Sequence, residues 1–220
     1  MPSRKRAQRW LIGASALALL VGPGVGLGVA SAGGGSGKLA SPGRLGPPGP
    51  EGPPIEAGAN LTAAGAPPPG GSVDGIQCGS TEQVAFHIHA RLTLYVGGKS
   101  MKVPAGVGIA DPQLERTPRG AFVGGGACFA WLHTHAADGV VHIESPVQRT
   151  YTLANFFDVW GQPLSRTRVG PARGRVTAWL NGKRWRGSPR AIPLRSHAQV
   201  QLEVGRPLVA PVRIADWNGL

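Results

Sequence analysis

The clearest hydrophobic pattern in the chain lies between residues 84 and 96, where apolar and polar side chains alternate. One face carries Phe86, Ile88, Ala90, Leu92, Leu94 and Val96, and the other carries His87, His89, Arg91, Thr93 and Tyr95. A period of two is typical of a β-strand, whose successive side chains point to opposite faces. The Gly97-Gly98 pair that follows predicts a tight turn into a returning strand over 99–103.

A second hairpin is expected from strands over about 127–135 and 140–145, joined by a four-residue turn at 136–139. This turn would pair His133 with His142, and His135 with Val140. Cross-strand partners lie about 5 Å apart at Cβ, so two paired imidazoles could share one ion. Asp138 lies in the turn, where an aspartate is explained by turn chemistry alone.

Two further patterns complete the predicted elements. Thr152 is placed to cap a short helix over 153–160 that ends at Gly161. The segment 175–183 repeats the pattern of 91–99, which predicts a duplicated β-hairpin element. In the second copy Pro171 and Arg173 stand where the first has His87 and His89, so the hairpin itself does not require those histidines.

These elements predict a mainly β domain over residues 77–215. We expect an antiparallel β-sandwich or barrel-like arrangement with one short helix and the duplicated hairpin. An α+β fold of the β-grasp type is the alternative.

The region before this domain has a different composition. Residues 1–32 combine a basic start with an uncharged stretch over 10–32 that ends in Ala30-Ser31-Ala32, which predicts a signal peptide or an N-terminal membrane anchor. Residues 33–76 are dominated by Gly, Pro, Ala and Ser and are expected to form a disordered linker. The domain would therefore lie outside the cytoplasm, either secreted or held at the membrane.

The two cysteines agree with an extracytoplasmic location. Cys78 and Cys128 are the only cysteines, and an even pair in an exported protein predicts a disulfide. Metal-bound thiolates are the rival interpretation.

The formal net charge of +12 is concentrated at the two ends of the chain. Eleven Lys and Arg residues follow residue 161, against only Glu203 and Asp216. An exported protein rarely meets nucleic acid, so no nucleic-acid partner is expected. Anionic cell-envelope polymer or lipid headgroups are the candidate partners of this basic region, but solvated strand faces are its simpler and preferred explanation.

The histidines carry the candidate chemistry. Five of the six lie in three short clusters: His87, His89, His133, His135 and His142. Each H-x-H pair on a strand directs both imidazoles to one face, and neutral imidazole is the commonest ligand of late transition metals. The pattern predicts a site for Zn²⁺ or Cu²⁺ first, with iron or manganese behind. His197 stands alone and is not expected to take part.

The segments 87–92, 131–146 and 151–161 resemble a family of exported bacterial and archaeal proteins for which no activity is established. The string H-T-H-x-x-x-G-x-x-H-I-E-S-P is its specific part, and the resemblance covers about 84–205. Members often have an acidic residue directly after H-T-H, where this chain has Ala136. A looser resemblance is to cupins, from which the spacing of His142 and Glu144 departs.

Three functions follow. The first is an extracytoplasmic metal-binding protein that sequesters, delivers or senses a metal ion, or uses it structurally. The second is a secreted metalloenzyme of hydrolytic or cupin-like oxidoreductase type, with Glu144 as candidate base. The third is a basic cell-envelope-binding domain. The sequence has no nucleophile elbow, P-loop or paired-carboxylate motif, which favours a non-enzyme.

Overall fold

The computed structural model describes residues 38–220, and this part of the chain is mainly β. Its strands form five sheets, which stay open and do not close into a barrel. One short α-helix, α1 (Leu153–Val159), is present among the described residues. The mainly β fold class expected from the sequence is confirmed.

The largest sheet contains the alternating strand, β3 (Phe86–Val96). Its order is β16 (Lys183–Trp185), β15 (Val176–Leu180), β18 (Ala198–Val204), β3, β10 (Val140–Ser145) and β9 (Leu132–His133), with β4 (Lys99–Met101) also paired to β3. Neighbouring strands are antiparallel except β18 and β3, which run parallel. The antiparallel expectation fails at this pair because β18 reaches β3 through a long connection, which can return a strand in either direction.

The two hairpins of the predicted duplication both form in this sheet. The β3–β4 turn has Gly97 and Gly98 at φ 57° and 77°, and the β15–β16 turn has Asn181 and Gly182 at φ 51° and 78°. Two consecutive positive φ angles are the mark of the tight turn that suits the twist of antiparallel strands. Strand β18 lies between the two hairpins.

The other described strands form four smaller sheets. A four-stranded sheet has the order β1 (Ser72–Val73), β2 (Ile76–Gly79), β8 (Cys128–Ala130) and β5 (Ile109–Ala110). The other sheets are β6 (Gln113–Thr117) with β7 (Gly120–Gly125), β11 (Tyr151–Thr152) with β17 (Pro193–Leu194), and β12 (Leu164–Ser165), β13 (Arg168–Val169) and β14 (Ala172–Arg173). A 3-10 turn, η1, covers Pro189–Ala191.

Helix α1 starts after Thr152, as predicted, and Gly161 follows it at φ 70°. The Asn155 side-chain oxygen accepts a hydrogen bond from the Thr152 backbone N–H, at 2.9 Å. Phe156 and Phe157 are fully buried and share one hydrophobic core with the apolar face of β3. That face is thereby covered, and the opposite face of β3 is the one that carries the histidines.

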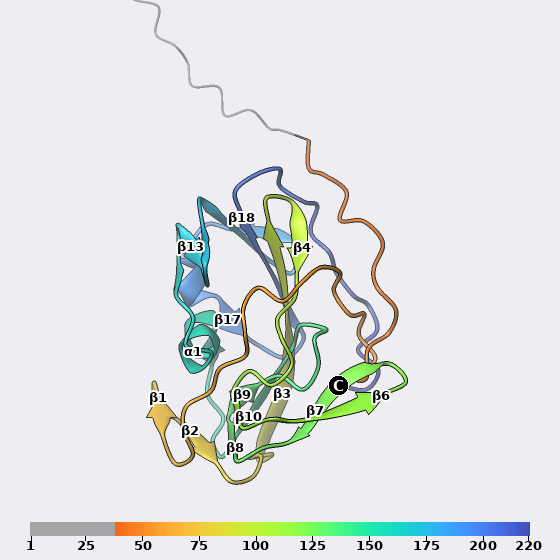
Figure 1. Cartoon of the computed structure of the whole chain (residues 1–220). Helices are drawn as coiled ribbons and strands as arrows, with labels where there is room; N and C mark the ends of the chain where they lie inside the picture. Colours follow the sequence, from red (N-terminus) through yellow and green to blue (C-terminus); the bar gives the residue numbers. More distant parts are fainter. Residues whose placement is uncertain (1–37) are drawn as a thin grey trace, which may run out of the picture. The chain divides into compact units, whose positions relative to one another are not determined.

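Residues 38–76 differ from the disordered linker that the sequence predicts. Ala40 exchanges backbone hydrogen bonds with Leu208 and Ala210, at 2.7 and 2.8 Å, and Glu56 forms a buried ion pair with Arg91 of β3. Figure 1 shows the orange start of this segment running beside the C-terminal chain. The prediction was based on the low hydropathy and the Gly and Pro content of the segment. The segment is instead held to the rest of the domain by backbone hydrogen bonds and one buried ion pair, which composition does not reveal.

The predicted signal peptide or anchor over 1–32, and the first linker residues, lie outside the described residues. Within residues 38–220 no helix is both long enough and apolar enough to cross a membrane.

Candidate metal centre

Three adjacent strands bring the histidines into one row across the sheet. His142 of β10 is the direct partner of His89 on β3 and of His133 on β9. Glu144, two residues along β10, is the partner of His87. The expected pairing of His133 with His142 is therefore confirmed. Directly paired residues project to the same face of the sheet, so these side chains share one face. The expected pair of His135 with Val140 does not form, because the β9–β10 ladder stops at His133.

The H-T-H segment is held in place by its central residue. The Thr134 hydroxyl donates a hydrogen bond to the Pro104 carbonyl at 2.8 Å, and the Thr134 backbone N–H donates to the Val107 carbonyl at 3.0 Å. The Thr134 carbonyl in turn accepts from the Gly106 N–H at 2.8 Å. With Thr134 fixed from both sides, the imidazoles on either side of it have little freedom to move apart.

His133 and His135 form what we call the inner pair, and both are buried. His133 Nδ1 donates to the Ala130 carbonyl at 2.9 Å, and His135 Nδ1 donates to the Val123 carbonyl at 2.6 Å. A carbonyl can only accept, so each Nδ1 carries the proton and each Nε2 of the neutral ring carries a lone pair. These two Nε2 atoms lie 3.1 Å apart. In this tautomer the two Nε2 lone pairs of neutral rings face each other, and an ion bound by both nitrogens would replace their repulsion with attraction.

The spacing of the inner pair suits two ligands on one ion. Imidazole nitrogens bind Zn²⁺ at about 2.0–2.1 Å, so two of them lie about 2.9 Å apart at a right angle and about 3.3 Å apart at the tetrahedral angle. The observed 3.1 Å lies between these values. Burial, together with the neighbouring His142 and His135, also lowers the pKa of His133 well below its usual value, which keeps the ring neutral.

His87 and His89 form the outer pair, with Nε2 atoms 3.0 Å apart. Burial, followed by repulsion from His142 and His87, lowers the pKa of His89 to about 3, so this ring is neutral as well. His87 Nε2 also lies 3.0 Å from Glu144 Oε1. The His87 side chain is 39% exposed, which makes the outer pair the side of the cluster that solvent reaches.

His142 and Glu144 lie between the two pairs. His142 donates from Nε2 to Glu51 at 2.6 Å, and its Nδ1 lies 3.1 Å from Glu144 Oε1. Burial alone would lower the pKa of His142, but hydrogen bonds to Glu144 and Glu51 raise it to about 9. Burial alone would raise the pKa of Glu144, but the His142 hydrogen bond and the nearby histidines lower it to about 2. Without a metal ion, an imidazolium between two carboxylates fits this geometry.

Two acidic residues near the histidines were not found by sequence reasoning. Glu51 comes from the segment predicted as a linker, and Glu82 lies just before β3, with Oε1 3.3 Å from His135 Nε2. A carboxylate that accepts from the outer nitrogen of a ligating histidine is a common second partner in metal sites, and Glu51 is placed for that role. The only signal in the sequence that could have pointed to them is the small number of acidic residues, eleven in the whole chain, which makes each of them a candidate partner for the histidines.

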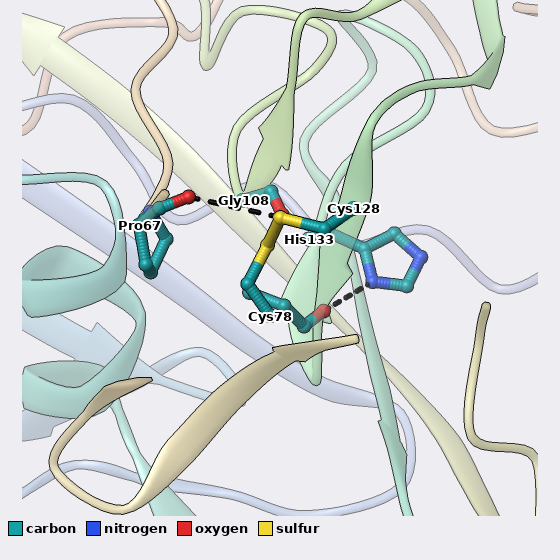
Figure 2. Close-up of a disulfide and its surroundings, with 6 residues drawn as sticks. Pro67, Cys78, Gly108, Cys128 and His133 are labelled. Carbon is teal, nitrogen blue, oxygen red and sulfur yellow. Dashed lines mark hydrogen bonds between the residues drawn. A yellow bond between two sulfur atoms is a disulfide. The ribbon is translucent and has the colours of Figure 1, made fainter. Parts of the chain in front are cut away.

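The predicted disulfide between Cys78 and Cys128 is present, so these residues are not thiolate ligands. The bond joins β2 to β8, and its Cys78 is the ladder partner of Ala130, the residue whose carbonyl accepts from His133. Figure 2 shows the disulfide beside His133, whose Nδ1 hydrogen bond ends on β8. The disulfide therefore stabilises the strand that orients one member of the inner pair.

Two residues remain outside the cluster, as expected. His197 is exposed and contacts the Leu220 carbonyl at 2.7 Å. Asp138 accepts a hydrogen bond from the Val140 N–H at 3.0 Å, which is the turn contact the sequence predicts. Burial and the nearby Glu51 carboxylate raise the pKa of Asp138 to about 7.

No protein-family model, curated protein or solved structure matches this chain. The functional argument therefore rests on the geometry of the site. That geometry shows buried histidine and glutamate clusters whose ligand atoms are close enough to hold a metal ion.

Proposed function

We propose that this protein binds a divalent transition metal ion outside the cytoplasm, to sequester it, deliver it, sense it or use it structurally. The observation that carries the proposal is the inner pair. Both Nδ1–H groups are committed to backbone carbonyls, and both Nε2 lone pairs converge at 3.1 Å. These hydrogen bonds to backbone carbonyls fix the tautomer that a metal requires, and they can stay in place when the ion binds to the Nε2 atoms.

The inner pair has enough neighbours for a complete ligand shell. His133, His135, His142 and Glu144 are all buried, and their ligand atoms lie within 4.8 Å of one another. Imidazole and carboxylate donors suit Zn²⁺ and Cu²⁺ best, with iron and manganese behind, and the disulfide leaves no thiolate for a softer ion. Four protein ligands favour storage, delivery or a structural role over catalysis, which needs an open position.

A secreted metalloenzyme is the second candidate, because the cluster is open on one side. His87 of the outer pair and Glu82 beside His135 have side chains that are 39% and 37% exposed, so water or a small ligand can reach the cluster. Glu144, the base candidate from the sequence, lies among the histidines and fits a ligand better than a base. Glu82 is the more accessible carboxylate for proton transfer.

The extracytoplasmic location is supported by two observations. The disulfide is of a kind that persists in oxidising compartments, and the sequence over 1–32 has the pattern of an export signal or anchor. We also propose that the chain belongs to the family of exported proteins whose H-T-H and H-I-E-S-P motifs it resembles. Most basic side chains after residue 161 are exposed, so anionic envelope polymer or lipid headgroups are proposed only as secondary partners.

The test is a Zn²⁺ and Cu²⁺ titration of the full chain in competition with a chromophoric chelator. The His133→Ala/His135→Ala variant should lose affinity at least about 100-fold, and His197→Ala, which changes a histidine outside the cluster, should bind as the wild type does. If the wild type binds neither ion more tightly than a variant that lacks both pairs, His87→Ala/His89→Ala/His133→Ala/His135→Ala, the proposed function is wrong.

A further inference from the structure

The six candidate ligands of the cluster form two overlapping sets of four, which share His142 and Glu144. One set is His133, His135, His142 and Glu144, and the other is His87, His89, His142 and Glu144. In each set all ligand atoms lie within 4.8 Å of one another. Two ligands on opposite sides of one ion are at most about 4.2 Å apart. Each set is therefore close to the size of one coordination shell, and the outer pair repeats the 3.0 Å spacing of the inner pair.

Glu144 is able to serve both sets. Its Oε1 lies 3.0 Å from His87 Nε2 in the outer pair and 4.0 Å from His133 Nε2 in the inner pair. Its Oε2 is buried and has no hydrogen-bond partner. A buried carboxylate oxygen without a partner is costly, and a metal ion would satisfy it. A carboxylate has two oxygens and can bridge two ions.

His142 can serve only one ion, because Glu51 holds its other nitrogen. A second ion therefore needs a different fourth ligand. Glu82 supplies one at the inner pair, with Oε1 at 3.3 Å from His135 Nε2 and 3.9 Å from His133 Nε2. The inner ion would then have His133, His135, Glu82 and Glu144, and the outer ion would have His87, His89, His142 and Glu144.

The distribution of charge agrees with two ions. Three carboxylates, of Glu51, Glu82 and Glu144, gather around five imidazoles in a chain that has only eleven acidic residues and a net charge of +12. With neutral imidazoles, the three carboxylates leave a formal charge of −1 after the first divalent ion binds and +1 after the second. The second ion therefore still enters a cluster of net negative charge.

The geometry points to a second divalent-cation site at the outer pair, so that the loaded protein holds two ions bridged by Glu144. This inference rests on the proposed function, because the second ion shares Glu144 with the first. Ions that share a bridging ligand lie about 3.5–4 Å apart in two-metal centres. His87 at the outer ion is 39% exposed and Glu82 at the inner ion is 37% exposed, so each ion would have one ligand that solvent reaches.

The test is the stoichiometry of Zn²⁺ in the full chain, measured by elemental analysis after equilibrium dialysis. The wild type should hold two equivalents. The variants His87→Ala/His89→Ala and His133→Ala/His135→Ala should each hold one. His87→Ala alone changes a partly exposed side chain, should leave the fold intact, and should weaken the second equivalent at least about tenfold while leaving the first unchanged.

A spectroscopic measurement tests the bridge directly. With two equivalents of Cu²⁺ the wild type should show a half-field electron paramagnetic resonance transition from two coupled ions, and His87→Ala/His89→Ala should show none. A wild type that saturates at one equivalent, with no half-field signal, refutes the second site and leaves the proposed function standing. A wild type that binds no metal refutes both.

Discussion

Replacement of Glu51 by glutamine is the substitution that best distinguishes a metal-binding site from a group of histidines that binds no metal. Glu51 contacts no ion in the proposed arrangement. It accepts a hydrogen bond from His142 Nε2 at 2.6 Å, and its side chain is only 6% exposed. This contact fixes the tautomer in which His142 Nδ1 is free to bind a metal. Glutamine keeps the shape of the side chain and removes the charge.

The size of the expected effect follows from this contact. A hydrogen bond with an ionised partner is roughly twice as strong as a neutral one, and little water reaches Glu51 to replace it. Loss of such a second partner typically weakens metal binding about 10- to 100-fold, which corresponds to about 1.4–2.8 kcal/mol. We expect the Glu51→Gln variant to bind Zn²⁺ more weakly by this factor, at an unchanged number of equivalents.

The assay is a competition titration with a chromophoric chelator at constant pH and ionic strength. Glu115→Gln is the matched control, because it makes the same chemical change at an exposed position on β6. The control should bind Zn²⁺ as the wild type does. If Glu51→Gln also binds within about twofold of the wild type, His142 does not act as a metal ligand oriented by Glu51, and this reasoning is refuted.

Three further predictions concern the scaffold. The Cys78→Ala/Cys128→Ala variant should lose about 4 kcal/mol of unfolding free energy in urea titrations, because the bond closes a loop of 50 residues; an unchanged midpoint would contradict this. Glu56→Ala leaves Arg91 as an unpaired buried charge, so it should lower the free energy of unfolding by about 3–5 kcal/mol and speed proteolysis within 38–76. Equal cleavage rates in the variant and the wild type would show that the ion pair does not hold the segment. Gly108→Ala should lower Tm and weaken metal binding, since its Cβ would lie 2.3 Å from a carbonyl oxygen at φ 75°, and an unaltered Tm would argue against that close contact.

The parts of the fold that were predicted from the sequence are those set by local rules. Alternation along β3 places His87 and His89 on one face, and Gly97-Gly98 specifies the turn that follows. The turn that ends at Gly139 brings His142 opposite His133, as its length predicts. These features depend on neighbours within about ten residues, so a single sequence contains them.

The parts that were missed depend on contacts between distant segments. Glu51 and Glu56 lie in a Gly- and Pro-rich region whose composition is typical of disorder, yet each has a buried partner on the main sheet. The parallel pairing of β18 with β3 joins strands about a hundred residues apart. Composition averages over such contacts, and one ion pair or backbone ladder does not change it.

The gathering of the histidines could be predicted from the sequence for a specific reason. An H-x-H pair converts strand periodicity into a statement about chemistry, because both rings must share a face. The sequence did not indicate that the histidines form two sets around Glu144, since this division depends on which strands are neighbours.

The most direct test of the metal-binding claim is the X-ray absorption spectrum of the full chain loaded with one equivalent of Zn²⁺. We predict a first shell of nitrogen and oxygen ligands at about 2.0–2.1 Å, with the outer-shell scattering of at least two imidazoles. The His87→Ala/His89→Ala/His133→Ala/His135→Ala variant, which lacks both pairs, should lose this imidazole scattering under the same conditions. A wild-type spectrum without imidazole scattering, identical to that of the variant, would contradict the proposal that the inner pair holds a metal ion.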